Sequence, residues 1–152
     1  MNTEATIRSI MTHHPITVNA SEKVSKVQEI FRDYDFHHLP VVQQGNKLIG
    51  IISKEDVAAL TYLMSMNTSG VTFSKNEYQH LLASDIMTKS PLTLDPDDSV
   101  GLAADIFLAN KFHAVPIVED GELVGIVTTH DLLRYSFSAP LVVENEDTFE
   151  ES

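Results

Sequence analysis

Two short stretches of the sequence, GIISKED and GIVTTHD, carry the same polar groups at the same spacing. Each contains a hydroxyl, at Ser53 or Thr128, that can donate a hydrogen bond to a phosphate or ribose oxygen. Three residues later each contains a carboxylate, at Asp56 or Asp131, which only accepts hydrogen bonds and so suits the two O–H donors of a ribose diol. A helix that begins at the hydroxyl would add unpaired backbone N–H groups and a partial positive charge. The chemistry of these residues is compatible with a phosphorylated sugar, while their spacing alone does not specify the ligand class.

The same spacing has a second interpretation that involves no ligand. A Ser or Thr followed three residues later by an acid is typical of a capping box, in which both side chains satisfy backbone N–H groups of their own helix. The two roles can coexist, because a cap uses only part of the hydrogen-bonding capacity of a hydroxyl.

The motif occurs twice because most of the chain is duplicated. The segment that starts IMTHHPITV aligns with the one that starts IMTKSPLTL at an offset of 76, which becomes 75 after the turn, where Gly50 matches Gly125. Two copies of one unit should share one local fold, and each is too small to bury its apolar face alone. We therefore expect a mixed α/β (α+β) fold in which two repeats pack about a pseudo-twofold axis.

Each repeat is predicted to contain a strand, a helix, a hairpin and a second helix. Apolar spacing of the helical type follows Ser21 and Asp97, which are the expected N-caps of the first helices. Ser53 and Thr128 are expected to open the second helices. The strands are expected at residues 16–18, 39–42 and 48–52 in the first repeat, and at residues 92–94, 115–118 and 123–127 in the second.

The domain boundaries follow from the alignment and from breaks in the apolar pattern. The sequence Thr68-Ser69-Gly70 interrupts any helix that continues from the first repeat, so this stretch is a linker. The last twelve residues contain five acids and no base and are expected to fray. We expect repeat 1 at residues 7–64, a linker at 65–82, repeat 2 at 83–136 and an acidic tail at 137–152.

The doubled unit, with its IMT-x-x-P opening and its two GIISKED-type motifs, resembles the CBS domain family over about residues 7–136. In that family a pair of repeats forms a Bateman module whose clefts bind adenosine-containing ligands such as AMP, ADP, ATP or S-adenosylmethionine. Each cleft takes residues from both repeats, and two modules commonly form a disc-like dimer through their helices. The resemblance implies that Ser53, Asp56, Thr128 and Asp131 bind such a ligand.

The remaining candidate ligand-binding residues surround these four. Gly50 and Gly125 lack a side chain and so permit the close approach of another backbone or of a purine. His37 and His113 occupy equivalent positions, where some family members place a histidine that reaches the phosphates; the alternative is a half-buried histidine bonded to a backbone carbonyl. Lys54 is the candidate cation. The expected walls of the purine site are Ile16, Thr17 and Val18 in one repeat and Leu92, Thr93 and Leu94 in the other.

Other histidines receive different predictions. His38 matches Ala114, so it is not part of the repeated design and is expected to set one site apart from the other. His13 and His14 match Lys89 and Ser90 and are expected on a loop surface. Because no His-x-x-x-His or similar spacing is present, no metal site is predicted.

Charge and composition exclude several classes of function. Ten Lys and Arg against 22 Asp and Glu give a net charge of −12, without a basic run, so nucleic acid and anionic membranes are not expected partners. The absence of cysteine excludes thiol catalysis. No secretory signal or membrane-spanning stretch is recognised, and a cytoplasmic protein is expected.

The charge is unequal between the copies. Residues 1–60 hold seven acids and six bases, a net of −1, whereas residues 83–140 hold nine and three, a net of −6. We therefore expect a polyphosphate to prefer the cleft that contains Asp56, served by Lys54 and by His37 or His38.

The function predicted from these residues is that of a regulatory module that binds an adenine nucleotide and acts on a partner protein in trans, since no output domain follows residue 140. No nucleophile–base pair, P-loop or GxGxxG is present, so no enzyme and no cofactor is predicted. A homodimer is expected, with the apolar residues 57–66 as its surface. The alternative is a dimerising interaction module without a ligand.

Overall fold

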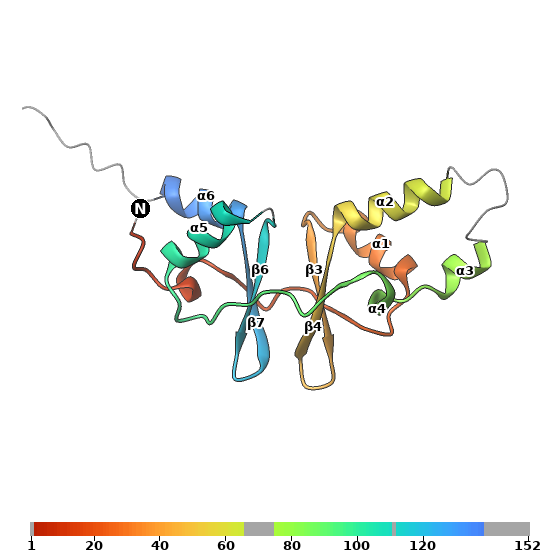
Figure 1. The fold of residues 1–152 in the computed structure, drawn as a ribbon, viewed down its shortest axis with the longest axis horizontal. Helices are drawn as coiled ribbons and strands as arrows, with labels where there is room; N and C mark the ends of the chain where they lie inside the picture. The colour runs from red at the N-terminus through yellow and green to blue at the C-terminus, as the bar shows by residue number, and fades with distance from the viewer. Residues whose placement is uncertain (1, 66–74, 111, 139–152) are drawn as a thin grey trace, which may run out of the picture.

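A computed structural model of the chain describes residues 2–65, 75–110 and 112–138, and it has two similar lobes (Figure 1). In each lobe a hairpin stands beside helices, and the two hairpins lie next to one another at the centre of the molecule. The predicted mixed fold of two repeated units is confirmed.

The elements of the two lobes follow the predicted order. The first repeat contains a 3-10 turn at Ile7–Ser9, β1 (Thr12–His13), β2 (Val18–Asn19), α1 (Val24–Asp33), β3 (His38–Gln43), β4 (Lys47–Ser53) and α2 (Lys54–Ser65). The second contains α4 (Ala83–Ile86), β5 (Thr88–Lys89), α5 (Val100–Ala109), β6 (Ala114–Glu119), β7 (Glu122–Thr128) and α6 (Thr129–Ser138). A further short helix, α3 (Lys75–His80), lies in the predicted linker, whereas Thr68-Ser69-Gly70 lies outside the described residues.

The hairpin strands agree with the sequence prediction, and the first strand of each repeat is shorter than predicted. In place of residues 16–18 the strand begins at Val18, and in place of residues 92–94 only Leu94 makes a bridge, to Ile117. α6 ends at Ser138, so the first two residues of the expected tail are helical, and the rest of that tail lies outside the described residues.

The predicted N-caps of α1 and α5 are wrong. Ser99, not Asp97, caps α5 by accepting a hydrogen bond from the backbone N–H of Leu102 at 3.1 Å, and α1 begins after Lys23 rather than near Ser21. Isolated bridges to the residue just before the other repeat explain the later starts, because they keep the residue before each helix extended: Thr6 pairs with Ser99 and Lys23 pairs with Leu82.

The two sheets are interleaved between the repeats. β1 of the first repeat pairs with β7 of the second, in the order β1-β7-β6, and β5 of the second repeat joins the sheet β2-β3-β4-β5. Thr12 lies opposite Ile126, and Thr88 lies opposite Ile51. The segment that opens each repeat is therefore part of the other lobe, which places residues of both repeats around each hairpin.

Gly50 and Gly125 make this exchange possible. A Cβ atom on Gly125 would lie 2.6 Å from the Met11 sulfur and 2.9 Å from the Thr12 carbonyl oxygen, and a Cβ on Gly50 would overlap Met87. The close approach predicted at these glycines is therefore made by the segment that opens the other repeat. At Gly50 the approaching group is the Met87 side chain, and at Gly125 it is the Met11 side chain together with the Thr12 backbone.

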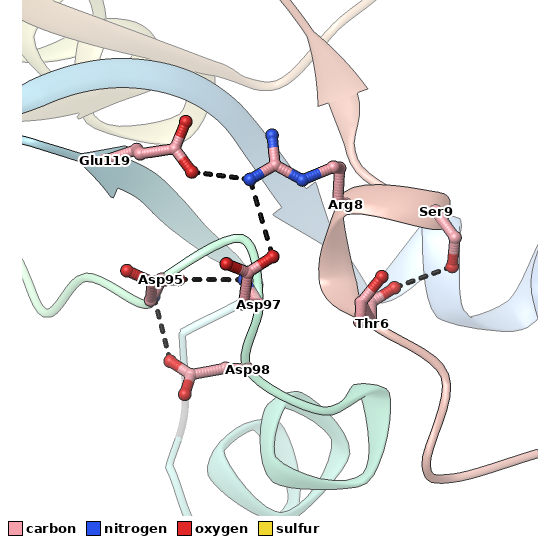
Figure 2. Close-up of polar contacts among 7 residues, drawn as sticks. All are labelled: Thr6, Arg8, Ser9, Asp95, Asp97, Asp98 and Glu119. Atoms are coloured by element: carbon pink, nitrogen blue, oxygen red, sulfur yellow. Dashed lines mark hydrogen bonds and ion pairs between the residues drawn. The ribbon is translucent and has the colours of Figure 1, made fainter.

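Among the described residues, ion pairs hold only one of the two exchanged segments in place. The Arg8 guanidinium contacts the carboxylate of Glu119 and, at 3.4 Å, that of Asp97 (Figure 2). The equivalent position in the other segment is Ser84. The backbones of the two segments make equivalent hydrogen bonds. The N–H of Ser84 donates to the Ala20 carbonyl at 3.0 Å, and the N–H of Arg8 donates to the Pro96 carbonyl at 2.9 Å. The backbone contact is thus shared between the lobes, whereas the charged contact belongs to the N-terminal segment.

Each lobe has its own apolar core. The first core is built around buried residues of α1, β3 and β4, among them Val27, Leu39 and Ile52, and the second around Ile7 together with residues of β6 and β7 such as Val115 and Val127. Because Ile7 comes from the first repeat, the second core is incomplete without the exchanged segment.

Candidate functional site

Two neighbouring cavities lie between the repeats, and each contains one of the two predicted motifs. Cleft 1, of about 570 Å³, is lined by Thr128 and Asp131 of the second repeat and by Thr12 and Ile16 of the first. Cleft 2, of about 420 Å³, is lined by the equivalent residues with the repeats exchanged, which are Ser53, Asp56, Thr88 and Leu92. The interleaved strands β1 and β5 bring these residues together, since each carries one repeat onto the hairpin of the other.

The motif of cleft 1 forms a complete capping box. The backbone N–H of Asp131 donates to the Thr128 hydroxyl at 3.1 Å, and the backbone N–H of Thr128 donates to the Asp131 carboxylate at 2.9 Å. Asp131 is only 6% exposed, and its second carboxylate oxygen lies 3.9 Å from the Arg134 guanidinium. The carboxylate is therefore fixed in position, with one oxygen used by the cap.

The motif of cleft 2 forms only half of this arrangement. The backbone N–H of Asp56 donates to the Ser53 hydroxyl at 3.1 Å, but among the described residues no hydrogen bond is made by the Asp56 carboxylate, which is exposed. Helix capping thus engages both side chains of the motif at Thr128 and Asp131. At the other motif Asp56 keeps its carboxylate oxygens accessible, as ligand binding requires.

The predicted purine walls are only partly cavity walls. Ile16 lines cleft 1 and Leu92 lines cleft 2. Val18 is buried in the first core and Leu94 packs against the second, because these two residues pair with Val41 and Ile117 of the buried hairpins, whereas Ile16 and Leu92 precede those pairings. Thr17 and Thr93, between them, line neither cavity.

Three further candidates lie outside the cavity linings. Gly50 and Gly125 face the methionine side chains described above instead of open space. Lys54 lines neither cavity, and its backbone N–H donates to the His37 carbonyl at 2.8 Å. Of the groups on which the expected charge preference for cleft 2 rests, His38 lines cleft 2 as well as cleft 1, whereas His37 lines cleft 1 and Lys54 lines neither.

The histidines gather where the two cavities meet. His37 lines cleft 1, and His113 lines both cavities, as does His38. His38 was expected to distinguish the two sites, but it is shared between them because β3 begins at their common wall. Glu55 is shared in the same way.

Burial affects the ionisation of His38, which lies on the wall that the two cavities share. Desolvation lowers the pKa of the His38 imidazole below its usual value, with His37 and His113 acting in the same direction, while Glu55 and Asp56 oppose the shift. His37 and His113 are exposed. The neutral form of His38 is therefore favoured near neutral pH.

Three basic side chains of cleft 1 were missed by the sequence interpretation: His14, His130 and Arg134. His14 had been expected on a loop surface. His130 and Arg134 lie next to the motif on α6. The alignment of the repeats could have identified them, because they differ in charge from the residues they match, Glu55 and Ala59. Differences between equivalent positions, rather than the shared motif, thus identify the residues that distinguish the two cavities.

Neither a metal centre nor a membrane span is found within the described ranges. No group of three or more His, Asp or Glu side chains there is placed to hold a metal ion. None of the described helices combines the length and the apolar character needed to cross a membrane.

The model of the CBS domain family matches residues 7–61 and 83–138. The chain belongs to the CBS domain family. The matched ranges correspond to the two repeats, so this is a tandem pair of CBS domains, the arrangement called a Bateman module.

The CBS pair is similar to part of an enzyme and to a plant CBS domain-containing protein. An inosine-5′-monophosphate dehydrogenase of Korarchaeum cryptofilum is 32% identical over 140 residues, which are 91% of this chain and 26% of the enzyme. The chloroplastic CBS domain-containing protein CBSX2 of Arabidopsis thaliana is 27% identical over 84% of this chain and 61% of that protein. The chain spans about a quarter of the length of the enzyme.

Solved CBS pairs superpose on this one closely. The crystal structure of CBSX2 in complex with AMP has a TM-score of 0.72 at 27% identity and covers 87% of this chain and 96% of that chain. The CBS domain pair of protein MJ0100, in complex with 5′-methylthioadenosine and S-adenosyl-L-methionine, has a TM-score of 0.71 at 26% identity, with the same coverage of both chains.

Proposed function

We propose that this CBS pair is a regulatory module that binds an adenosine-containing ligand between its repeats and acts on a partner protein in trans. The observation that carries the proposal is that each hydroxyl–carboxylate motif lies at a helix start and lines a cavity whose opposite wall comes from the other repeat. The AMP complex of CBSX2 and the 5′-methylthioadenosine and S-adenosyl-L-methionine complex of MJ0100 support the ligand class.

The cavity linings supply each interaction that such a ligand needs. The ribose diol donates to Asp131 in cleft 1, through the carboxylate oxygen that the cap leaves available, or to Asp56 in cleft 2. A phosphate is bound by the helix N-terminus and by the hydroxyl of Thr128 or Ser53. The purine lies against Ile16 in cleft 1 or Leu92 in cleft 2.

A ligand bound between the repeats can change their relative position. Each cavity has walls from both repeats, so a bound ligand contacts both at once and stabilises the arrangement that fits it best. Ligand binding changes the affinity for a partner only if the partner also binds one arrangement of the repeats more tightly than another. This requirement makes the relation between ligand and partner reciprocal, and hence measurable from either side.

The exposed apolar residues of the helices offer a surface for association. In the first lobe these are Tyr62 and Leu63 on α2, which are 63% and 67% exposed, whereas Val57 of the expected segment is buried in the core and Met66 lies outside the described residues. In the second lobe Leu108 on α5 and Phe137 on α6 are 87% and 84% exposed. We include a homodimer through these helices in the proposal.

A thermal-unfolding panel tests the proposal. Ligand-stripped protein is heated with AMP, ADP, ATP, S-adenosylmethionine or 5′-methylthioadenosine at about 1 mM, and a ligand present at about 100 times its dissociation constant should add about 2.7 kcal/mol to the free energy of unfolding. A shift of several degrees for one adenosine ligand, and none for the matching guanosine compound, is expected. Equal behaviour of all compounds would contradict the proposal.

A second candidate function is a dimerising interaction module that binds no ligand. The capping box at Thr128 and Asp131 favours it, because helix capping alone accounts for the positions of both side chains. The variant Asp131→Asn separates the two functions, since the amide keeps an oxygen that can accept the Thr128 N–H but removes the charge and changes the hydrogen bonding available to a ribose. Loss of binding with unchanged melting temperature supports ligand binding, and a wild-type protein without any ligand response supports the second candidate.

A further inference from the structure

Five of the seven histidines in the chain line one cavity. They are brought there from distant positions by the interleaved fold: from the segment before β2, from the start of β3 and the residue before it, from the segment before β6, and from the first turn of α6. The five are His14, His37, His38, His113 and His130.

The other charged side chains of cleft 1 give it a negative charge while these histidines are neutral. One guanidinium, that of Arg134, is set against three carboxylates among the described lining residues. The carboxylates are those of Asp35 after α1, Glu55 on α2 and Asp131 on α6. Tyr34, which also lines the cavity, carries no charge near neutral pH.

This charge pattern conflicts with the binding of a phosphate unless protons are also taken up. A phosphomonoester carries close to two negative charges at neutral pH and would be placed among carboxylates that already outnumber the cations. Imidazoles ordinarily titrate near pH 6.5, and an anion within a few ångströms favours their protonated form. The lining can therefore become complementary to a phosphate through its histidines.

We propose that cleft 1 binds the phosphorylated form of its adenosine ligand together with protons taken up by its histidines, so that occupancy of this cleft responds to nucleotide and to pH at once. The inference rests on the proposed function and assigns a mode of regulation to the same site. A nucleoside without a phosphate presents no anion to the imidazoles, so its binding takes up few or no protons.

The positions of the histidines indicate which of them take up the protons. His37 and His113 are exposed, so their charged forms keep contact with water, and both line cleft 1. His38 is half-buried at the shared wall, where Glu55, Asp56, His37 and His113 surround it, and burial disfavours its charged form. We assign the proton uptake chiefly to His37 and His113.

The experiment compares two ligands that differ only in the phosphate. Dissociation constants for AMP and for adenosine are measured by calorimetry at pH 6.5 and pH 8.0. Each imidazole whose pKa rises by about one unit on binding makes AMP bind about fourfold tighter at the lower pH, or more than tenfold for two imidazoles. The phosphate of AMP also titrates, with a pKa near 6, so the histidine variants described next are needed to separate proton uptake by the protein from proton uptake by the ligand. Adenosine should change by less than about twofold.

A matched pair of double variants locates the effect. In H37Q/H113Q the logarithm of the ratio of the AMP dissociation constants at pH 8.0 and pH 6.5 should fall by at least half. The control H13Q/H80Q alters the two histidines outside the cavity and should keep the wild-type ratio. All four side chains are exposed, so the substitutions are expected to leave folding intact. Repeating the AMP titrations in buffers of different ionisation enthalpy gives the number of protons taken up directly.

The outcomes distinguish this inference from the proposed function. If adenosine and AMP both bind and neither depends on pH, the inference is overturned and the proposed function stands. If neither binds, the proposed function fails and the inference fails with it. If AMP tightens at low pH equally in the wild type and in H37Q/H113Q, the assignment to these histidines is wrong.

Discussion

The carboxylate of Asp131 accepts a hydrogen bond from the backbone N–H of Thr128 at 2.9 Å, and the two residues together begin helix α6. Their counterparts at α2 retain only the bond from the backbone N–H of Asp56 to the Ser53 hydroxyl. One of two duplicated motifs is therefore locked into its own helix, while the other presents an accessible carboxylate.

This difference predicts unequal stability effects for the same substitution. Asp131→Ala leaves the Thr128 N–H without its partner and should lower the free energy of unfolding by about 1 kcal/mol, which lowers the melting temperature by about 2–4 °C for a chain of this size. Asp56→Ala is the matched control and should stay within about 0.5 kcal/mol of wild type. Thermal unfolding without ligand provides the measurement. Equal losses in both variants would show that the capping difference has no energetic consequence.

The exchanged segments predict a steric coupling at Gly50. Gly50→Ala places a methyl group against Met87 and should cost about 1–3 kcal/mol, as overpacked interiors do. Because the three atoms nearest the new methyl group all belong to the Met87 side chain, adding Met87→Ala should recover part of that loss, and a double-mutant cycle measures the coupling. Gly125→Ala should be rescued less well by Met11→Ala, since the Thr12 carbonyl oxygen also obstructs it. Strict additivity at Gly50 would contradict the packing described for this lobe.

The shared wall predicts a pH dependence of folding that needs no ligand. Burial lowers the pKa of His38 in the folded chain, so below its ordinary value near 6.5 the unfolded chain binds more protons there. His38 therefore contributes stability that is present above pH 6.5 and is lost as the pH falls toward the folded-state value. His38→Gln should reduce the slope of melting temperature against pH between 6.5 and 5.5, and His80→Gln should not. A steeper slope in His38→Gln would reverse the assigned direction.

The exposed helix residues predict a dimer whose interface can be weakened from the surface. Leu108→Ser and Phe137→Ser replace side chains that are more than four-fifths exposed, so they should shift a dimer toward monomer without unfolding it. Sedimentation equilibrium over a range of protein concentrations measures the shift, and thermal unfolding at one concentration verifies folding. Leu133→Ser, at 57% exposure on the same helix as Phe137, tests how far the surface extends. A monomer at all concentrations in the wild type would refute the homodimer.

The duplication explains how much of the fold was predictable. Repeated apolar spacing places the hairpins and helices correctly, because burial of an apolar face depends mainly on local periodicity. The exchange of β1 and β5 between the lobes could not be predicted in this way, since a two-residue strand has no periodicity and its partner is determined by tertiary packing. The late starts of α1 and α5 have the same cause, as Thr6 and Leu82, which make the bridges, each directly precede the other repeat.

The candidate site was predictable where it repeats and poorly predictable where it differs. Ser53, Asp56, Thr128 and Asp131 line the cavities because both copies carry the same motif. Val18 and Leu94 do not, since the direction of a side chain in a short extended segment depends on the neighbouring strand. His130 and Arg134 were missed because they occur in one copy only.

The most direct test of ligand binding between the repeats is a methyl NMR titration with AMP that follows the isoleucine signals. Ile16 and Ile126 line cleft 1 and Ile51 lines cleft 2, whereas Ile7 and Ile52 are fully buried in the two cores. Binding as proposed should shift the signals of Ile16 and Ile126, of Ile51, or of all three, in a saturable way, with small changes at Ile7 and Ile52. Unchanged cavity signals at millimolar AMP, or shifts greatest away from both cavities, would contradict a nucleotide-binding function for this CBS pair.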